Sequence, residues 1–282
     1  MPKQFFCARE ESETTRVALL GIPFDATSSF RPGSRFAPDH IRLYSEGIES
    51  YSPYQHKDLA ECAFTDAGNV VDLTINNFSV LRKAVHIEVT QHLRAGKKVL
   101  ALGGEHLISL PVATAYVERY PDLNVIHLDA HADLRDEYLG EKYSHATVIR
   151  RISEILGAEK IYQFGIRSGT REEFAFGDQA AHFYPFSLNP AAVQAVVEEL
   201  QGSPVYLTLD LDVLDPACFP GTGTPEPGGV SFQELLQTLL LFGQLKLVGA
   251  DIVELCPAYD HSDVSTITAI KLVRELLLIL DE

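Results

Sequence analysis

Short apolar runs alternate with longer segments of helical periodicity along most of the 282-residue chain. The run at residues 16–23 is continuously apolar and is closed by Gly and Pro, which predicts a first buried strand. Residues 78–94 instead carry apolar side chains at helical spacing, and Gly96 stands where such a helix would end. The pattern therefore predicts strands and helices that follow one another along the chain.

The predicted elements continue this alternation to the end of the sequence. Strands are expected at residues 16–23, 62–67, 98–102, 124–129, 160–166, 182–186, 205–211 and 247–255. Helices are expected at residues 38–49, 78–94, 108–120, 146–156, 171–179, 191–200, 232–242 and 264–280. Such alternation is typical of an α/β fold with a parallel sheet. Because no linker-like stretch divides the chain, we expect a single domain over residues 1–282.

Polar residues follow the apolar run at 123–127 in the order Asp129-Ala130-His131-Ala132-Asp133. An extended strand places alternate side chains on one face, so Asp129, His131 and Asp133 are expected to converge. Taken alone, this motif is more often a polar strand end than a metal site. The interpretation depends on whether other strands carry similar ends.

Two further predicted strands do carry such ends. The strand at 205–211 ends in Asp210 and Asp212, again two residues apart, and His106 follows the strand at 98–102. Parallel α/β sheets bring the carboxyl ends of their strands to one edge, where ligands bind. Four Asp and two His side chains are therefore expected at one edge. Burying so many like charges without compensation would be costly, which favours bound cations or solvated carboxylates.

Carboxylates and imidazoles without thiolates suit Mn²⁺, although Zn²⁺, Co²⁺ or Ni²⁺ could occupy the same ligands. Six ligands are too many for one transition-metal ion and are natural for two ions bridged by carboxylates. A pair of ions of this kind activates water at neutral pH. The motifs therefore predict a hydrolase with a binuclear metal centre.

Composition and charge narrow the class of partner. The formal net charge of −16 argues against nucleic acid and anionic membrane surfaces, and it is compatible with a cationic substrate. The four cysteines, which form no Cys-x-x-Cys pair, are expected to be free thiols in a reducing compartment. No signal peptide or membrane span is evident, so we expect a cytoplasmic protein.

Six motifs together resemble the ureohydrolases, the family of arginase and agmatinase, over nearly the whole chain. They are residues 103–106 (GGEH), 129–133 (DAHAD), 144–147 (SHAT), 210–216 (DLDVLDP), 220–225 (PGTGTP) and 251–255 (DIVEL). The resemblance implies a three-layer α/β/α fold with a central, mostly parallel sheet of about eight strands. It also implies two Mn²⁺ per chain and a homo-oligomer, either a trimer or a hexamer.

The resemblance assigns a role to each of the six candidate ligands. His106 and Asp210 would complete the shell of one ion, and His131 and Asp212 that of the other. Asp129 and Asp133 would be bridging or shared ligands. Asp133 would also take a proton from the attacking water and deliver it to the departing amine, a duty that suits a carboxylate beside the nucleophile.

Three more residues are expected at the site by the same resemblance. Glu254 would hold the substrate guanidinium, for which a bidentate carboxylate is well shaped. His145 would bind substrate and shuttle protons, although a His next to Ser144 is by itself more often a plain helix start. Thr224, in the rigid Gly- and Pro-rich segment 220–229, would be at most a substrate contact.

The loop at residues 134–143 bears on the substrate. It lacks Asn and carries three acids against two bases, which suits a substrate with a distal amine. Some of Asp136, Glu137 and Glu141 are expected to supply an acidic rim to the pocket. The residues at 144–147 and 212–229 also resemble those of agmatinase. Together with the loop, they favour an agmatinase that converts agmatine to putrescine and urea in polyamine biosynthesis. Alternatives are N1-aminopropylagmatine, guanidinobutyrate or arginine as substrate, or a catalytically silent metal-binding regulatory subunit.

Overall fold

Eight parallel strands form the central sheet of the protein. The computed structural model describes residues 3–71, 73, 77–180 and 182–282. The strand order is β4-β1-β5-β10-β9-β6-β7-β8, and each neighbouring pair is parallel. The strands are β1 (Val17–Ile22), β4 (Phe64–Asn69), β5 (Lys98–Gly103), β6 (Asn124–Leu128), β7 (Ile161–Phe164), β8 (Phe183–Tyr184), β9 (Pro204–Asp210) and β10 (Lys246–Val253). The predicted α/β fold with about eight strands is confirmed.

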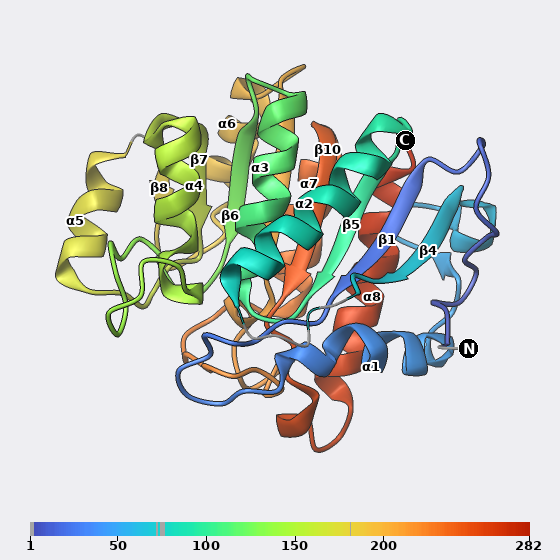
Figure 1. The fold of residues 1–282 in the computed structure, drawn as a ribbon, viewed down its shortest axis with the longest axis horizontal. Helices are drawn as coiled ribbons and strands as arrows, with labels where there is room; N and C mark the ends of the chain where they lie inside the picture. Colours follow the sequence, from blue (N-terminus) through green and yellow to red (C-terminus); the bar gives the residue numbers. More distant parts are fainter. Residues whose placement is uncertain (1–2, 72, 74–76, 181) are drawn as a thin grey trace.

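The described residues form eight α-helices, and all but α5 lie on one of the two faces of this sheet. They are α1 (Ala37–Tyr44), α2 (Phe78–Arg94), α3 (Ser109–Arg119), α4 (Val148–Leu156), α5 (Arg171–Gln179), α6 (Pro190–Glu199), α7 (Phe232–Phe242) and α8 (Val264–Leu280). Helices α2, α3 and α4 pack side by side in front of the sheet in Figure 1, and α1, α8, α7 and α6 pack along the other face. The result is the three-layer arrangement expected from the resemblance.

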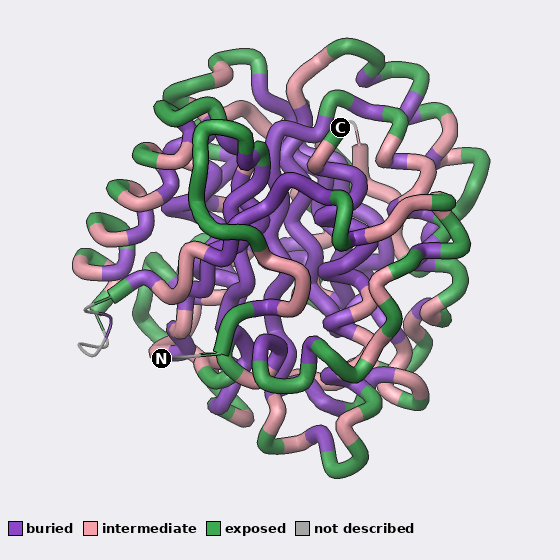
Figure 2. The backbone as a smooth tube through the Cα atoms, turned by 90° about the vertical axis from the view of Figure 1, so that its right-hand side faces the viewer, coloured by how far each residue is buried: buried purple, intermediate pink, exposed green. Residues whose placement is uncertain are grey.

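Each face of the sheet has its own apolar core, because strands of a parallel sheet are buried on both sides. In the α2 layer, Leu81, Val85, Val89 and Leu93 form the buried stripe that the helical spacing predicts. On the opposite face, α8 contributes most of its apolar residues to the second core. Figure 2 shows the buried strands in the middle of the molecule and exposed turns around them.

Several element ends differ from the prediction. Strand β6 ends at Leu128, before Asp129, because the chain turns there. The helix expected at 38–49 ends at Tyr44 and continues only as a 3₁₀ turn, Ser45–Gly47. Strand β8 is two residues long because it is the sheet edge and pairs with only two residues of β7. The small hairpin of β2 (Tyr51–Ser52) and β3 (Lys57–Asp58) was not predicted.

The strand order places the predicted ligands at one edge. Strands β5, β10, β9 and β6 are consecutive neighbours, although β9 and β10 come much later in the chain than the other two. Their carboxyl ends are level, since Val253 pairs with Asp210 and Leu128 pairs with Leu209. The loops after these four strands therefore meet, as expected for a ligand site in an open α/β sheet. No helix in the described residues is long and apolar enough to cross a bilayer.

Candidate metal centre

The two acidic motifs turn the chain sharply at the ends of β6 and β9. Asp129 Oδ1 accepts a hydrogen bond from the backbone N–H of His131 at 2.6 Å, and Asp210 Oδ1 accepts one from Asp212 N–H at 2.8 Å. A carboxylate that caps the backbone two residues onward forms an Asx-type turn. The side chains therefore converge because of these turns. The alternation of an extended strand, which we predicted for 129–133, is not the cause.

His106 lies at the centre of the first group of side chains. Its Nδ1 lies 3.1 Å from Asp129 Oδ2, 3.2 Å from Asp133 Oδ2 and 3.3 Å from Asp210 Oδ2. Its Nε2 lies 2.8 Å from the Thr208 hydroxyl. Nδ1 is buried and has no partner of hydrogen-bond geometry among the described residues. An imidazole nitrogen left unpaired among three carboxylates is the donor set that a divalent cation requires.

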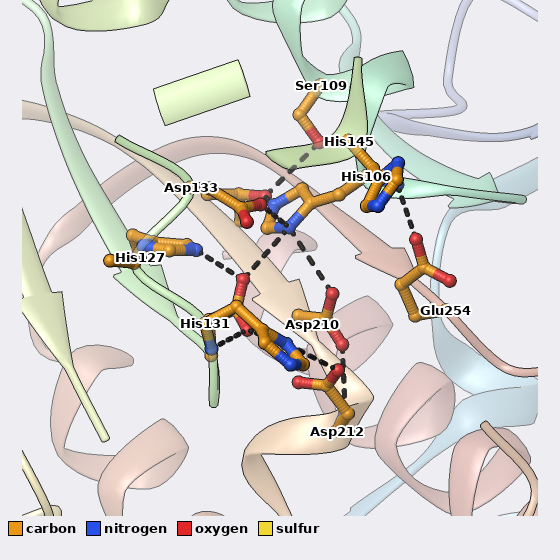
Figure 3. A network of polar contacts seen from close by, with 12 residues as sticks. His106, Ser109, His127, His131, Asp133, His145, Asp210, Asp212 and Glu254 are labelled. Atoms are coloured by element: carbon orange, nitrogen blue, oxygen red, sulfur yellow. Dashed lines mark hydrogen bonds and ion pairs between the residues drawn. The ribbon is translucent and has the colours of Figure 1, made fainter. Parts of the chain in front are cut away.

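A second group lies beside the first (Figure 3). His131 Nδ1 is 3.0 Å from Asp212 Oδ2 and 3.5 Å from Asp129 Oδ1. The hydroxyl of Thr224 is 3.4 Å from Asp212 Oδ2. Asp129 belongs to both groups, so its two oxygens face two separate sets of ligand atoms. The arrangement is compatible with a binuclear centre in which Asp129 joins the two ions.

The electrostatics of the metal-free cluster also favour cations. Burial, reinforced by the charge of Asp129, raises the pKa of Asp133 to about 7. Burial and neighbouring carboxylates raise the pKa of Asp210 and of Glu254 well above their usual values. Carboxyl groups behave in this way when they are desolvated near like charges. Divalent ions would neutralise the same charges, so the residues present fit such a centre.

Asp133 and Glu254 both have left-handed backbone conformations, with φ of 53° and 66°. Non-glycine residues rarely adopt such angles, which cluster at functional sites when the surrounding structure enforces them. Glu254 directly follows β10, and its Oε1 accepts a hydrogen bond from the backbone N–H of His106 at 2.9 Å. This bond ties the carboxylate to the loop that carries the first ligand.

A cavity of about 230 Å³ opens over the cluster. Of the nine predicted site residues, only Asp129 does not line it, since it is fully buried beneath. The predicted residues on its wall are His106, His131, Asp133, His145, Asp210, Asp212, Thr224 and Glu254. The structure therefore brings all nine together, with Glu254, His145 and Thr224 on the wall around the ligand cluster.

His145 is held by a loop from the start of the chain. Its backbone N–H donates to the Thr27 hydroxyl at 3.1 Å, and its ring nitrogens lie 3.4 Å from the hydroxyls of Thr27 and Ser29. Buried Glu105 accepts hydrogen bonds from Thr27 N–H, Thr27 Oγ1 and Ser28 Oγ. Burial, followed by the nearby charge of His131, lowers the pKa of His145 to about 4. The imidazole is thus neutral at neutral pH.

The three acids expected at the rim do not line the cavity itself. Asp136 forms an ion pair with Arg151 at 2.7 Å, and neither it nor Glu137 nor Glu141 is among the described residues that line the cavity. The side chains of Arg135 and Glu173 line it instead, 3.3 Å apart. Glu141 instead lines an adjoining hollow, which shares Ser29 and Tyr138 with this cavity, so the acidic rim stays a prediction.

His127 is a member of the cluster that the sequence analysis did not select. Its Nε2 lies 2.8 Å from Asp129 Oδ2, inside β6. It stands at the end of the apolar run 123–127, where a lone His is usually a core residue. The available signal was its position two residues before Asp129, since alternate residues of a strand share a face.

Comparison with known proteins places these features in a family. The arginase family model matches residues 15–279. An agmatinase from Bacillus anthracis is 45% identical over 280 residues, which cover 98% of this chain and 96% of the relative. A guanidinobutyrase from Pseudomonas aeruginosa is 34% identical over 283 residues, covering 96% and 88% of the two chains. The crystal structure of the agmatine ureohydrolase of Thermoplasma volcanium superimposes with a TM-score of 0.87 at 34% identity, covering 99% of this chain and 94% of that one. The chain therefore belongs to the arginase family of ureohydrolases.

Proposed function

We propose that this protein is an agmatinase, a ureohydrolase that hydrolyses agmatine to putrescine and urea with two divalent metal ions. The reaction class is supported by one observation above all: a buried His and Asp cluster and the carboxylate of Glu254 face a single cavity. The substrate is supported by 45% identity to agmatinases over nearly the full length of both chains. The whole chain, residues 1–282, would act as one catalytic domain.

The proposed ligands are His106, Asp129, Asp133 and Asp210 for one ion, and Asp129, His131, Asp133 and Asp212 for the other. When bound, such ions would polarise the substrate and lower the pKa of a water molecule in the cavity. Manganese is the proposed metal, because the donors are carboxylates and imidazoles without a thiolate.

The residues of the chain have separate tasks in this proposal. Glu254 binds the guanidinium group as a bidentate ion pair, held in place by the backbone N–H of His106. Asp133 takes the proton of the attacking water and returns it to the leaving amine. His145, neutral and anchored to the loop at Thr27, transfers protons at the wall of the cavity. Thr224 contacts substrate or orients Asp212.

Three further properties belong to the proposal. The protein acts in the cytoplasm, which four free cysteines support because thiols persist in a reducing compartment. It supplies putrescine for polyamine biosynthesis. It assembles as a homo-oligomer, a trimer or a hexamer, as its family resemblance implies.

Guanidinobutyrate is the second candidate substrate. The guanidinium of Arg135 lines the cavity, where it could pair with the carboxylate that guanidinobutyrate carries at its distal end. The 34% identity to a guanidinobutyrase supports the same alternative. One observation favours agmatine instead. Arg135 is already paired with the buried carboxylate of Glu173, which compensates the guanidinium charge and weakens its attraction for a ligand carboxylate.

The test is release of urea by the metal-loaded protein from agmatine, guanidinobutyrate, N1-aminopropylagmatine and arginine under one condition. We expect the highest kcat/KM for agmatine. A higher value for guanidinobutyrate would move the assignment to the second candidate. Activity on none of the four, with two metals bound, would favour an untested guanidine or the silent regulatory subunit.

A further inference from the structure

His127 and Gln163 form a buried pair beneath the proposed metal centre. They are register partners on neighbouring strands β6 and β7, so their side chains stand on the same face of the sheet. Both are buried, at 0% and 3% exposure. A buried pair of polar side chains must satisfy its hydrogen bonds internally, which makes the direction of each bond deducible.

The direction of the Gln163 amide follows from its backbone contact. Gln163 Nε2 lies 2.9 Å from the carbonyl oxygen of Ala132 and 2.9 Å from His127 Nδ1. A carbonyl oxygen can only accept, so the end of the amide that faces Ala132 must be the NH₂ group. The same NH₂ group then donates to Nδ1 of His127, which must therefore be the unprotonated ring nitrogen.

The remaining proton of His127 is consequently on Nε2, where it is donated to Asp129 Oδ2 at 2.8 Å. The other oxygen of Asp129 is held by the His131 backbone N–H at 2.6 Å. Each oxygen of this carboxylate thus has a fixed protein donor. In addition, the Ala132 carbonyl directly precedes Asp133, whose left-handed backbone needs support from its surroundings.

We propose that His127 and Gln163 are positioning residues that fix Asp129 and Asp133 for metal binding, and that His127 is not itself a ligand. Its Nε2 lies close enough to the cluster for ligation. However, in the tautomer that Gln163 imposes, this nitrogen carries a proton directed at Asp129 and has no free lone pair. The inference rests on the proposed function in that Asp129 and Asp133 are taken as metal ligands.

The experiment titrates metal-free protein with Mn²⁺ alone by calorimetry and records the absorption spectrum of the Co²⁺-loaded form. His127→Phe fills the space without a donor and should weaken Mn²⁺ binding about 10- to 100-fold, the usual effect of losing a hydrogen bond to a ligand. His127→Gln keeps an amide N–H near the position of Nε2 and should bind Mn²⁺ within about threefold of wild type. Gln163→Leu should weaken binding about tenfold, because it frees both His127 and Ala132.

Tyr162→Phe is the matched control. Tyr162 is the neighbour of Gln163 on β7, packs in the core on the opposite face and donates to Glu199 at 2.8 Å. Its loss should leave Mn²⁺ affinity and the Co²⁺ spectrum unchanged. Circular dichroism and thermal melting show whether His127→Phe folds. If it does not, the Mn²⁺ affinity of Gln163→Leu is compared with that of Tyr162→Phe, and this comparison tests the inference.

Three results would overturn the inference. If His127→Phe folds and binds Mn²⁺ with wild-type affinity, the pair only fills the core. If it does not fold, wild-type affinity in Gln163→Leu has the same meaning. Loss of one bound ion in His127→Gln would make His127 a ligand. Equal weakening in Tyr162→Phe would make the effect one of general stability. Because no substrate is used, these results are independent of whether agmatine is hydrolysed.

Discussion

Asp133 and Glu254, which both line the cavity, have left-handed backbone conformations that cost free energy. A left-handed backbone is uncommon at residues other than Gly, Asn and Asp, so it is more costly at Glu254 than at Asp133. At Asp133 the Ala132 carbonyl is held by Gln163, and at Glu254 the backbone N–H donates to Gly104 at 2.9 Å. Tertiary contacts thus enforce the backbone angles that aim both carboxylates into the site.

Asp133→Asn should abolish turnover while the fold is kept, because Asn tolerates the same backbone conformation. The change removes a metal-binding carboxylate and the proton carrier together, so kcat should fall by about a thousandfold or more. The assay is urea release from agmatine at saturating Mn²⁺, with exposed Asp136→Asn as the matched control. Wild-type turnover in Asp133→Asn would contradict the proposed mechanism.

Glu254→Gln should weaken substrate binding more than metal binding. A neutral amide still accepts the His106 backbone N–H but forms no ion pair with a guanidinium, a loss of about 1.5–3 kcal/mol. We expect KM for agmatine to rise about 10- to 100-fold. Elemental analysis should still find two metals per chain; a drop to one would instead identify Glu254 as a ligand.

Metal affinity should fall as the pH drops below 7. Burial and the Asp129 charge raise the pKa of Asp133 to about 7 in the metal-free protein, so protons compete with metal at this group. Each pH unit below 7 should raise the Kd for Mn²⁺ about tenfold for each proton displaced. Calorimetric titrations at pH 5.5, 6.5 and 7.5 check this; a Kd independent of pH would contradict it.

The raised pKa values of the buried carboxyl groups also affect the stability of the metal-free fold, which they favour at low pH. The folded-state pKa of Asp133 lies above its ordinary value of 3.8, and Asp210 and Glu254 shift the same way. The folded chain therefore binds these protons more tightly than the unfolded chain. This contribution to stability is present at low pH and is lost as the pH rises through about 7.

At the scale of elements, the segment 103–106 connects the site to the rest of the fold. Gly104 lies so close to the backbone of Phe24 that a Cβ atom placed there would be 2.0 Å from the Phe24 carbonyl oxygen. Glu105 then holds the loop at Thr27 and Ser28, and His106 faces the cluster. One tight strand end thus sets the position of a ligand and of the loop that anchors His145.

Gly104→Ala should therefore disturb the site from a position outside it. The Phe24 backbone would have to move, with a loss of about 1–3 kcal/mol in the free energy of unfolding. Urea denaturation of the metal-loaded protein measures this loss. Gly47→Ala is the control, because its Cβ would meet only the flexible Ile267 side chain at 3.1 Å. Equal stability of the two variants would contradict the close approach at Gly104.

At the scale of the whole molecule, we do not expect the net charge of −16 to determine specificity at the cavity. The acids of the loop at 134–143 are exposed or paired elsewhere, and exposed charges are screened by salt. The cavity wall holds a paired Arg135 and Glu173 instead. We therefore expect this pair to affect discrimination between guanidines more than the surface field does.

Neutralising the loop acids together, as Asp136→Asn, Glu137→Gln and Glu141→Gln, should change the kcat/KM ratio of agmatine to arginine by less than about threefold. Glu173→Gln should change it more, because the Arg135 charge would lose its partner at the cavity wall. Initial rates on both substrates give the ratios. A large change of this ratio in the triple variant would show that the loop acids act as an acidic rim.

The sequence by itself determined the layer architecture and the identity of the candidate ligands. Apolar spacing located α2, α5, α7 and α8 at their observed bounds, because helix periodicity is a local property of the chain. The Asp and His motifs pointed to a metal-dependent hydrolase, since few other roles bring such residues to several strand ends. Membership of the ureohydrolase family and its agmatinase relatives agree with that reading.

Tertiary structure decided what depends on residues distant in sequence. The insertion of β9 and β10 between β5 and β6 brings the ligands together, and a turn at Asp129 replaces the extended backbone expected for residues 129–133. His127 contacts Asp129 and Gln163, and Arg135 and Glu173 line the cavity as a pair. Hydrogen bonds and ion pairs of this kind are set by which strands become neighbours and which loop side chains turn inward. Local spacing along the chain does not contain that information.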